Sequence, residues 1–176
     1  MHEDMREFVA ADLLSLDSQS EDFVKPYRKK FLPLNGGDIF DLGNLTLEIL
    51  ECPGHTPGSV MILIKDERAI IFGDSCNPSV WMFLPESTTI AHYRESLRKI
   101  QERAGEYDKV YLSHEPNDAP KEILDEVLNV CHNIIEGEIE AIPYHELGEN
   151  VFIAQSDQVT TNNITKEDIV VRILYK

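Results

Sequence analysis

Three residues of types that bind metal ions, His55, Asp74 and His114, follow or precede short apolar segments. His55 sits in a corner, residues 53–58, that contains two prolines and two glycines. Prolines fix φ and glycines permit close backbone approach, so we expect this corner to be stiff. A metal ligand needs stiff support, because coordination tolerates only small errors in geometry. Two imidazoles and a carboxylate are donors that zinc and iron sites use.

The apolar segments around these residues predict that they meet at one edge of a sheet. Residues 60–64 and 69–72 are apolar runs separated by a polar turn, which is typical of a β-hairpin. In a hairpin of two strands of matching length, the chain returns to the sheet edge from which it left. His55 precedes the first strand and Asp74 follows the second, so both are expected at the same edge. A helix at 89–104 and a strand at 109–113 then predict a parallel crossover that brings His114 beside Asp74. The alternative interpretation is that His55, Asp74 and His114 are unrelated polar residues at the ends of loops and form no common site.

Composition restricts the class of partner. The 176 residues suffice for one domain with a hydrophobic core. The excess of 32 Asp+Glu over 16 Lys+Arg gives a net charge of −16, which disfavours nucleic acid and anionic membrane surfaces. A small-molecule substrate that is neutral or bridged by a metal remains possible, because a bound cation dominates the local charge whatever the net charge. Three widely spaced cysteines and no recognisable secretion or membrane segment predict a reducing compartment, and therefore a cytoplasmic location.

The rest of the chain predicts alternating helices and strands. A loop at 76–87 carries Trp81 and Phe83, which by position after Asp74 could form one wall of a substrate pocket or could cover the core. Asp118 is expected to cap a helix that ends at Gly137. Further segments predict an amphipathic helix at 3–16, strands at 31–34 and 39–50, and three short strands around 139–142, 151–154 and 169–174.

Three motifs resemble those of the metallo-β-lactamase-fold hydrolases, which include glyoxalase II and many thioester, lactone and phosphodiester hydrolases. They are Pro-Gly-His-Thr-Pro-Gly-Ser at 53–59, Ile-Phe-Gly-Asp at 71–74 and Tyr-Leu-Ser-His at 111–114, in the family's order. The resemblance implies an α/β (α+β) fold, an αββα sandwich of two mixed β-sheets with outer helices. It also implies two metal ions, zinc or else iron or manganese, with His55 on the first, Asp74 bridging both and His114 on the second.

The sequence departs from the family at one motif. The family's His-x-His-x-Asp-His string does not occur in the 176 residues, so the chain resembles the part C-terminal to that motif. We therefore expect an incomplete single domain over 1–176, with a β-rich extension at 138–176. Three ligands are too few for two ions, so weak binding or a single ion is expected. Cys52, Cys76 or His2 could approach a metal, although core thiols and an exposed terminus are the simpler interpretations.

Two functions from different classes remain open. The first is a metal-dependent hydrolase in which a bridging hydroxide attacks an ester, thioester, lactone or phosphodiester. The second is a catalytically inactive half-domain that forms a homodimer or complements a separate N-terminal segment. The second function follows if the absence of the family's N-terminal strands leaves an apolar sheet face and an unpaired strand edge exposed. The remaining histidines, His92, His132 and His145, are expected at the surface.

Overall fold

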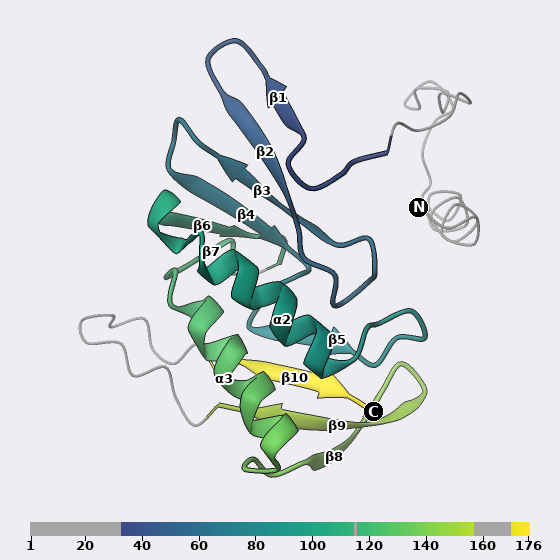
Figure 1. Cartoon of the computed structure of the whole chain (residues 1–176). Coiled ribbons are helices and arrows are strands. Elements are labelled where there is room, and N and C mark those ends of the chain that lie inside the picture. The colour runs from purple at the N-terminus through teal and green to yellow at the C-terminus, as the bar shows by residue number, and fades with distance from the viewer. Residues whose placement is uncertain (1–32, 115, 157–169) are drawn as a thin grey trace, which may run out of the picture. The chain divides into compact units, whose positions relative to one another are not determined.

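The computed structural model of the chain describes residues 33–114, 116–156 and 170–176 (Figure 1). The chain divides into two compact units, Met1–Pro33 and Leu34–Lys176, and every described helix and strand belongs to the second. The helix expected at 3–16 lies outside the described residues.

The larger sheet has six strands in the order β1-β2-β3-β4-β6-β7. Neighbouring strands run antiparallel except β4 and β6, which are parallel. The helix between β4 and β6 makes this parallel pairing possible, because a short turn could join only antiparallel neighbours. The strands are β1 (Ile39–Asp41), β2 (Thr46–Glu51), β3 (Val60–Ile64), β4 (Ala69–Gly73), β6 (Lys109–Leu112) and β7 (Asp118–Ala119).

The smaller sheet has four strands in the order β5-β10-β9-β8. β5 is parallel to β10, and the other two pairs are antiparallel, so this sheet is mixed as well. Its strands are β5 (Ser79–Met82), β8 (Ile142–Glu146), β9 (Glu149–Gln155) and β10 (Arg172–Tyr175).

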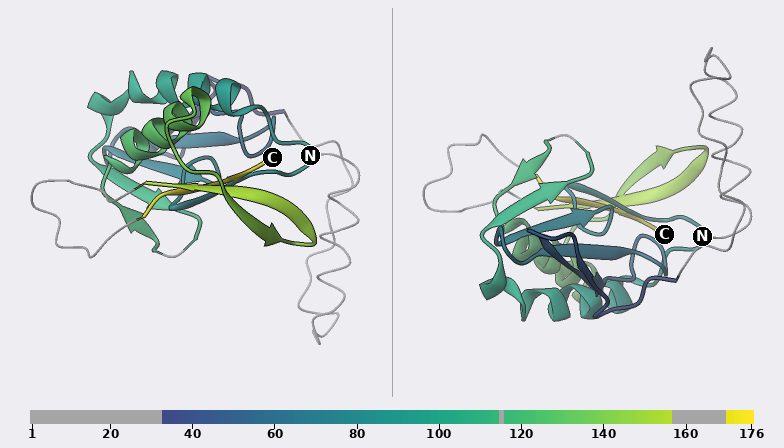
Figure 2. Two further views of the ribbon diagram at one scale, coloured as in Figure 1. Left: turned by 90° about the horizontal axis from the view of Figure 1, so that it is seen from below. Right: turned by 90° about the horizontal axis from the view of Figure 1, so that it is seen from above.

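Two α-helices lie side by side on one side of the strands, as both views in Figure 2 show. α2 (Ile90–Gln101) begins after Thr89, whose hydroxyl accepts a hydrogen bond from the His92 amide, and α3 (Ile123–Glu136) ends at Gly137 with φ of 72°. A short 3₁₀ turn, η2 (Ala104–Glu106), follows α2. No helix in the described ranges is both long and apolar enough to cross a bilayer. The expected α+β class with two mixed sheets is confirmed.

One apolar core joins both sheets to both helices. On β3, Met61 and Leu63 are fully buried, while their neighbours on the strand are only partly so, because alternate side chains point to opposite faces. The buried face packs against α2 and α3, and the same cluster includes Val80 of β5 and Ile173 of β10. The two sheets are therefore held in place by the core that the helices cover.

Two sequence expectations were wrong about strands. The single strand expected at 39–50 is a hairpin of β1 and β2, because Gly43 turns the chain with φ of 93° and Asp41 accepts a hydrogen bond from its amide. The loop expected at 76–87 contains β5, which forms only by pairing with β10 far along the chain. Leu34, at the end of the strand expected for 31–34, is in no strand.

The start of α3 also differs from expectation. Asp118 does not cap the helix; it lies in β7, paired with Tyr111 of β6, and the helix begins at Ile123. The β3–β4 hairpin, α2 and β6 match the predicted segments. Among the described residues, three strands follow α3, as expected. The first begins at Ile142, where the expected strand was to end.

Glu48 provides a test of how the larger sheet is fastened to the end of α2. Its carboxylate, 12% exposed, accepts two hydrogen bonds of 3.1 Å from Arg103 and lies 2.8 Å from the Lys65 ammonium. These contacts lower the pKa of Glu48 to about 2 from its usual 4.5. Glu48→Gln should lower the free energy of unfolding at pH 7 by about 1 kcal/mol, because both cations keep part of their water contact.

The lowered pKa of Glu48 also predicts how its stabilising effect changes with pH. Since folding lowers the pKa of Glu48, its stabilisation is full above pH 4.5 and is lost as the pH falls towards 2. Urea titrations between pH 7 and pH 2.5 should therefore show the wild type and Glu48→Gln converging in acid. Glu67→Gln, which removes an exposed partner of Lys109, is the matched control and should change little at any pH. A constant difference at all pH values would contradict the assignment.

Candidate active site

The corner that carries His55 is fixed by hydrogen bonds at both sides. The Ser59 hydroxyl accepts a hydrogen bond from the Thr56 amide (3.1 Å), and the Ser59 carbonyl accepts one from the Cys52 amide (3.0 Å). The Ser87 hydroxyl donates to the His55 carbonyl at 2.9 Å. The corner is thus stiff, as its prolines and glycines predict.

The side chain of Tyr93, on α2, contacts both the His55 corner and the segment after β4. A Cβ built on Gly54 would lie only 2.2 Å from Cδ2 of the Tyr93 ring, so the corner can approach the helix only because residue 54 has no side chain. The Tyr93 hydroxyl donates a hydrogen bond of 2.5 Å to the Ser75 carbonyl. Burial raises the pKa of Tyr93 well above its usual value, so this hydroxyl keeps its proton. One buried side chain therefore positions the neighbours of both His55 and Asp74.

The ring of His55 has a defined orientation. Its Nδ1 lies 2.7 Å from the Trp81 carbonyl oxygen, which can only accept a hydrogen bond, so Nδ1 carries the proton. In the neutral ring the lone pair is then on Nε2. A backbone carbonyl that accepts a hydrogen bond from one ring nitrogen in this way is the usual arrangement behind a metal-binding histidine.

Asp74 follows a bulge at the end of β4. The register with β6 shifts between Ile71 and Gly73, and Gly73 has φ of 58°, in the left-handed region. A bulge of this kind changes the direction of the next side chain and ends strand pairing. Asp74 is thereby turned out of the sheet edge, where its side chain is 50% exposed.

His114 lies beside Asp74 because β6 runs parallel to β4. Its Nε2 is 2.9 Å from Oδ1 of Asp74, and its side chain is 71% exposed. The crossover through α2 thus brings together two residues that are forty positions apart in the chain.

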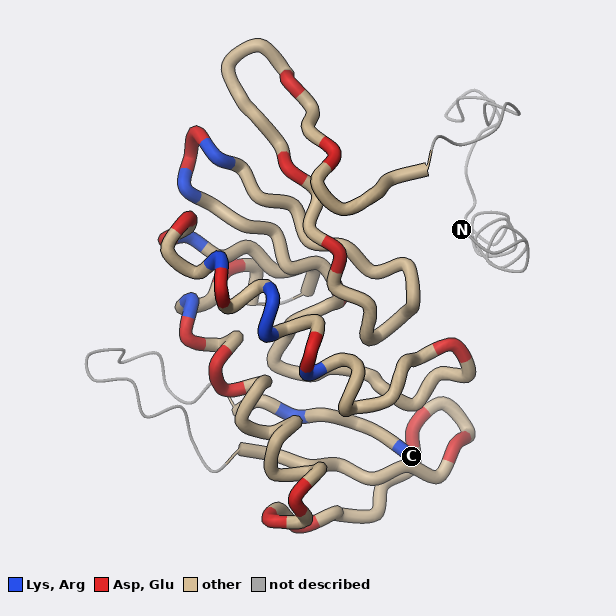
Figure 3. Tube along the Cα trace, viewed as in Figure 1, with Lys and Arg blue, Asp and Glu red and all other residues tan. Residues whose placement is uncertain are grey.

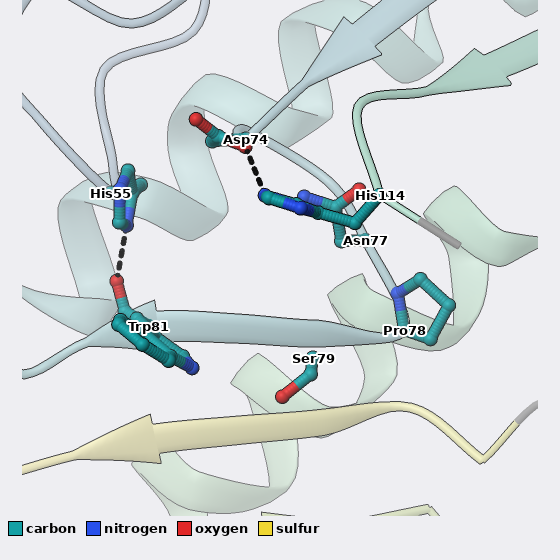
Figure 4. Close-up of a pocket in the computed structure, with 7 residues that line it drawn as sticks. All are labelled: His55, Asp74, Asn77, Pro78, Ser79, Trp81 and His114. Carbon is teal, nitrogen blue, oxygen red and sulfur yellow. Dashed lines mark hydrogen bonds and ion pairs between the residues drawn. The ribbon is translucent and has the colours of Figure 1, made fainter. Parts of the chain in front are cut away.

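His55, Asp74 and His114 all line one pocket of about 400 Å³ (Figure 4). Trp81 also lines it, whereas Phe83, the other expected substrate contact, does not. Phe83 is 3% exposed and packs in a small cluster with Val151 and Leu174, its ring centroid 5.5 Å from that of Trp81. The pocket therefore lies between the strand ends of the larger sheet and the β5 edge of the smaller one.

Sequence reasoning missed three pocket residues, Asn77, Pro78 and Ser79. Asn77 is 4% exposed, and its Oδ1 has no hydrogen-bond partner among the described residues. The sequence held no clear local signal for them, because Ser79–Met82 is one polar residue followed by three apolar ones, and β5 forms only by pairing with β10.

The donor types suit a metal ion, but the described residues do not complete a site. Within these ranges, no group of three or more His, Cys, Asp or Glu side chains is arranged to hold one ion. Asp74 and His114 are in contact, while His55 is directed into the pocket from the side of Trp81 (Figure 4). Further donors would be needed for the usual coordination number of about four.

The cysteines do not extend the donor set. Cys52, Cys76 and Cys131 are free and buried, and they lie outside the pocket lining. Burial raises the pKa of Cys52 and of Cys131 to about 12, and that of Cys76 well above its usual value. These thiols are therefore neutral core residues, and the thiolate form that binds metals is strongly disfavoured. His92, His132 and His145 are exposed, as expected.

The pocket lining, as far as the structure describes it, contains an acidic residue but no lysine or arginine. Figure 3 shows acidic residues distributed over the loops and helices, with few basic residues on the strands of the smaller sheet. The described lining therefore offers a negatively charged substrate no lysine or arginine side chain.

Comparison with known proteins identifies a family. The sequence model described as the metallo-beta-lactamase superfamily matches residues 4–114, more than half of the chain. A metallo-beta-lactamase family protein from Thermus thermophilus is similar in structure, with 21% identity over 63% of this chain and 38% of that one, and a TM-score of 0.50.

Two further solved structures are similar over shorter parts. A metallo-beta-lactamase from Pontibacter korlensis shares 19% identity over 57% of this chain and 47% of its own, with a TM-score of 0.48. An archaeal metallo-beta-lactamase superfamily protein from Sulfolobus tokodaii shares 21% identity over 56% of this chain and 38% of its own, with a TM-score of 0.42. The chain spans less than half the length of these three proteins, and at such identities the likeness concerns the fold alone.

The contact between Gly54 and Tyr93 can be tested with two glycines of the same corner. Gly54→Ala should lower the free energy of unfolding by about 1–3 kcal/mol, because the new methyl group overlaps the Tyr93 ring. Gly58→Ala should have little effect, since no described atom lies within 4 Å of its Cβ position. Thermal unfolding of both variants measures the difference. Equal stability of the two would show that the corner does not depend on this packing.

Proposed function

This chain belongs to the metallo-beta-lactamase superfamily, and from that premise we propose that it takes part in metal-dependent hydrolysis of an ester, thioester, lactone or phosphodiester. The observation that supports the proposal most is the pocket lined together by His55, Asp74 and His114, which come from three separate segments. Ordinary surface residues have no reason to be gathered in this way around a cavity.

The three side chains have separate parts in the proposal. His55 offers Nε2, because the Trp81 carbonyl holds the proton on Nδ1. Asp74 offers a half-exposed carboxylate, and His114 an imidazole that is already in contact with it. A bound metal ion would lower the pKa of a water molecule and polarise the scissile carbonyl or phosphoryl group. Trp81 closes one wall of the pocket against water.

We propose zinc as the metal, with iron or manganese as the alternatives, and up to two ions in a complete site. Because the described donors do not complete one site, binding to this chain should be weak or partial. The free, buried cysteines support the further proposal that the protein works in a reducing compartment such as the cytoplasm.

Metal affinity tests the proposal directly. Calorimetric titration of the chelator-treated chain with Zn²⁺ should show binding, and His55→Ala, Asp74→Asn and His114→Ala should each weaken it by more than about tenfold. Hydrolysis of simple esters and phosphodiesters, if present, should fall in the same variants.

His145→Ala is the control, because it removes an exposed histidine of β8 that lies outside the pocket lining. It should leave zinc affinity unchanged. An equal loss of zinc affinity in His145→Ala, or no loss of zinc affinity in the three pocket variants, would mean that zinc binds elsewhere. Either result would overturn the proposed function.

A second candidate function is assembly, in which the chain is inactive and pairs with a second copy. The observation that favours it is a group of exposed apolar residues at the edge strand β1, namely Ile39 and Phe40 of the strand, Leu42 after it and Leu34 before it. β1 is an edge of the larger sheet, and apolar edges are sites where another chain can pair.

Light scattering at several concentrations tests this assembly. A dimer should have twice the 20.1 kDa mass, and the double variant Ile39→Ser/Leu42→Ser should raise the dimer dissociation constant at least about tenfold. Ile135→Ser, an exposed apolar residue of α3, is the matched control. A monomer at all concentrations would exclude self-assembly and leave a separate N-terminal segment as the remaining partner for this edge.

A further inference from the structure

Asn77 is a polar residue of the pocket lining that the fold buries almost completely. Its side chain is 4% exposed, and its Oδ1 has no hydrogen-bond partner among the described residues. A buried acceptor without a partner destabilises the folded state, because it has lost its water and gained no donor. An apolar side chain of the same size would avoid this loss, so the amide needs an explanation other than packing.

The other end of the Asn77 amide faces the pocket. Within the described ranges Nδ2 makes no hydrogen bond, yet it is not one of the fully buried atoms that lack a partner. Nδ2 therefore keeps an accessible surface, and the pocket is the cavity that Asn77 lines. The reverse orientation would bury an NH₂ group without an acceptor, which is rarer in proteins than a buried carbonyl oxygen without a donor. Asn77 thus presents a hydrogen-bond donor to the pocket.

The segment that carries Asn77 is held on both sides. Before it, the Ser75 carbonyl accepts a hydrogen bond of 2.5 Å from the Tyr93 hydroxyl. After it, the Pro78 carbonyl accepts one of 2.8 Å from the Arg172 amide. Pro78 also restricts the residue before it to extended backbone. The amide is therefore fixed before a ligand arrives, which is the condition for a hydrogen bond that stabilises a transition state.

A neutral donor suits the charge of this pocket. The described lining contains Asp74 and no lysine or arginine, and an ammonium group here would pair with that carboxylate, whereas an amide stays available. Ser79 also lines the pocket, but it is exposed, so water competes for its hydroxyl. Figure 4 shows Asn77 on the same side of the pocket as Asp74 and His114, with Trp81 across from them.

We propose that Nδ2 of Asn77 donates a hydrogen bond to the carbonyl or phosphoryl oxygen of a substrate whose reacting group lies near Asp74 and His114. Negative charge develops on that oxygen during attack, and a fixed donor stabilises it. The role on the reacting oxygen rests on the proposed hydrolysis, whereas donation to a bound acceptor oxygen does not. A neutral hydrogen bond of this kind should tighten binding of an acceptor about two- to tenfold.

Triethylphosphine oxide is the probe for this donor, because it is neutral, carries a strongly accepting oxygen on a tetrahedral centre and is not hydrolysed. Titrated into the full chain with a chelator present, it should move the side-chain amide resonance of Asn77 downfield in nitrogen–proton NMR spectra. That resonance is identified by its absence from Asn77→Leu and Asn77→Asp. Triethylphosphine sulfide has nearly the same shape but is a poor acceptor, and it should leave the resonance in place.

Two variants each remove a buried polar atom that has no partner among the described residues, and only one should change binding. Asn77→Leu should weaken binding of the oxide about two- to tenfold, measured by the probe's phosphorus resonance. Asn77→Asp, which keeps the shape but has no N–H donor, should weaken it at least as much. Tyr107→Phe is the matched control, because the Tyr107 hydroxyl lies outside the pocket lining. It should leave binding unchanged. Asn77→Leu and Tyr107→Phe should unfold at the wild-type temperature or slightly above it.

Several outcomes would overturn the inference. They are an Asn77 resonance that the oxide does not move, equal binding of oxide and sulfide, or unchanged binding in both Asn77 variants with a loss in Ser79→Ala. The last result would identify the Ser79 hydroxyl as the donor. Zinc binding without a response to the oxide would contradict only the role of Asn77. A response to the oxide without zinc binding would contradict only the proposed hydrolysis.

Discussion

The packing of Tyr93 against Gly54 is the contact on which the pocket depends. The ring allows the His55 corner to approach α2 only because residue 54 is a glycine, and the hydroxyl of the same ring holds the Ser75 carbonyl, one residue after Asp74. Tyr93 is itself fixed by the core beneath the helix. The interior of the domain therefore determines where the partly buried His55 and the exposed Asp74 lie, and rigid support of this kind is what a binding site requires.

The smaller sheet completes the pocket in a different way. The Trp81 carbonyl orients the His55 ring, and the Trp81 side chain forms part of the wall. Both depend on β5, which exists as a strand because β10 pairs with it along one edge. The C-terminal strands thus belong to the architecture of the pocket, although the described lining includes none of their residues.

Local patterns predicted much of the fold. The β3–β4 hairpin, α2 and β6 follow from apolar runs, a threonine cap and helical spacing, all of which act between neighbours in sequence. The gathering of His55, Asp74 and His114 at one edge also followed, because a hairpin and a parallel crossover leave few other arrangements. The strand β5 and the turn at Gly43 were missed, since pairing partners and a positive φ are not visible in a single short segment.

By itself, the sequence determined the class of fold, the net negative charge and the three polar residues at the strand ends, because these depend on composition, periodicity and chain connectivity. Only the tertiary structure decided that the Trp81 carbonyl fixes the proton of His55, and that Phe83 is buried in a small apolar cluster beside β10 and does not line the pocket. Each of these depends on contacts between residues of different strands and loops. Such contacts are set by how sheets and helices pack, and no local pattern in the sequence records them.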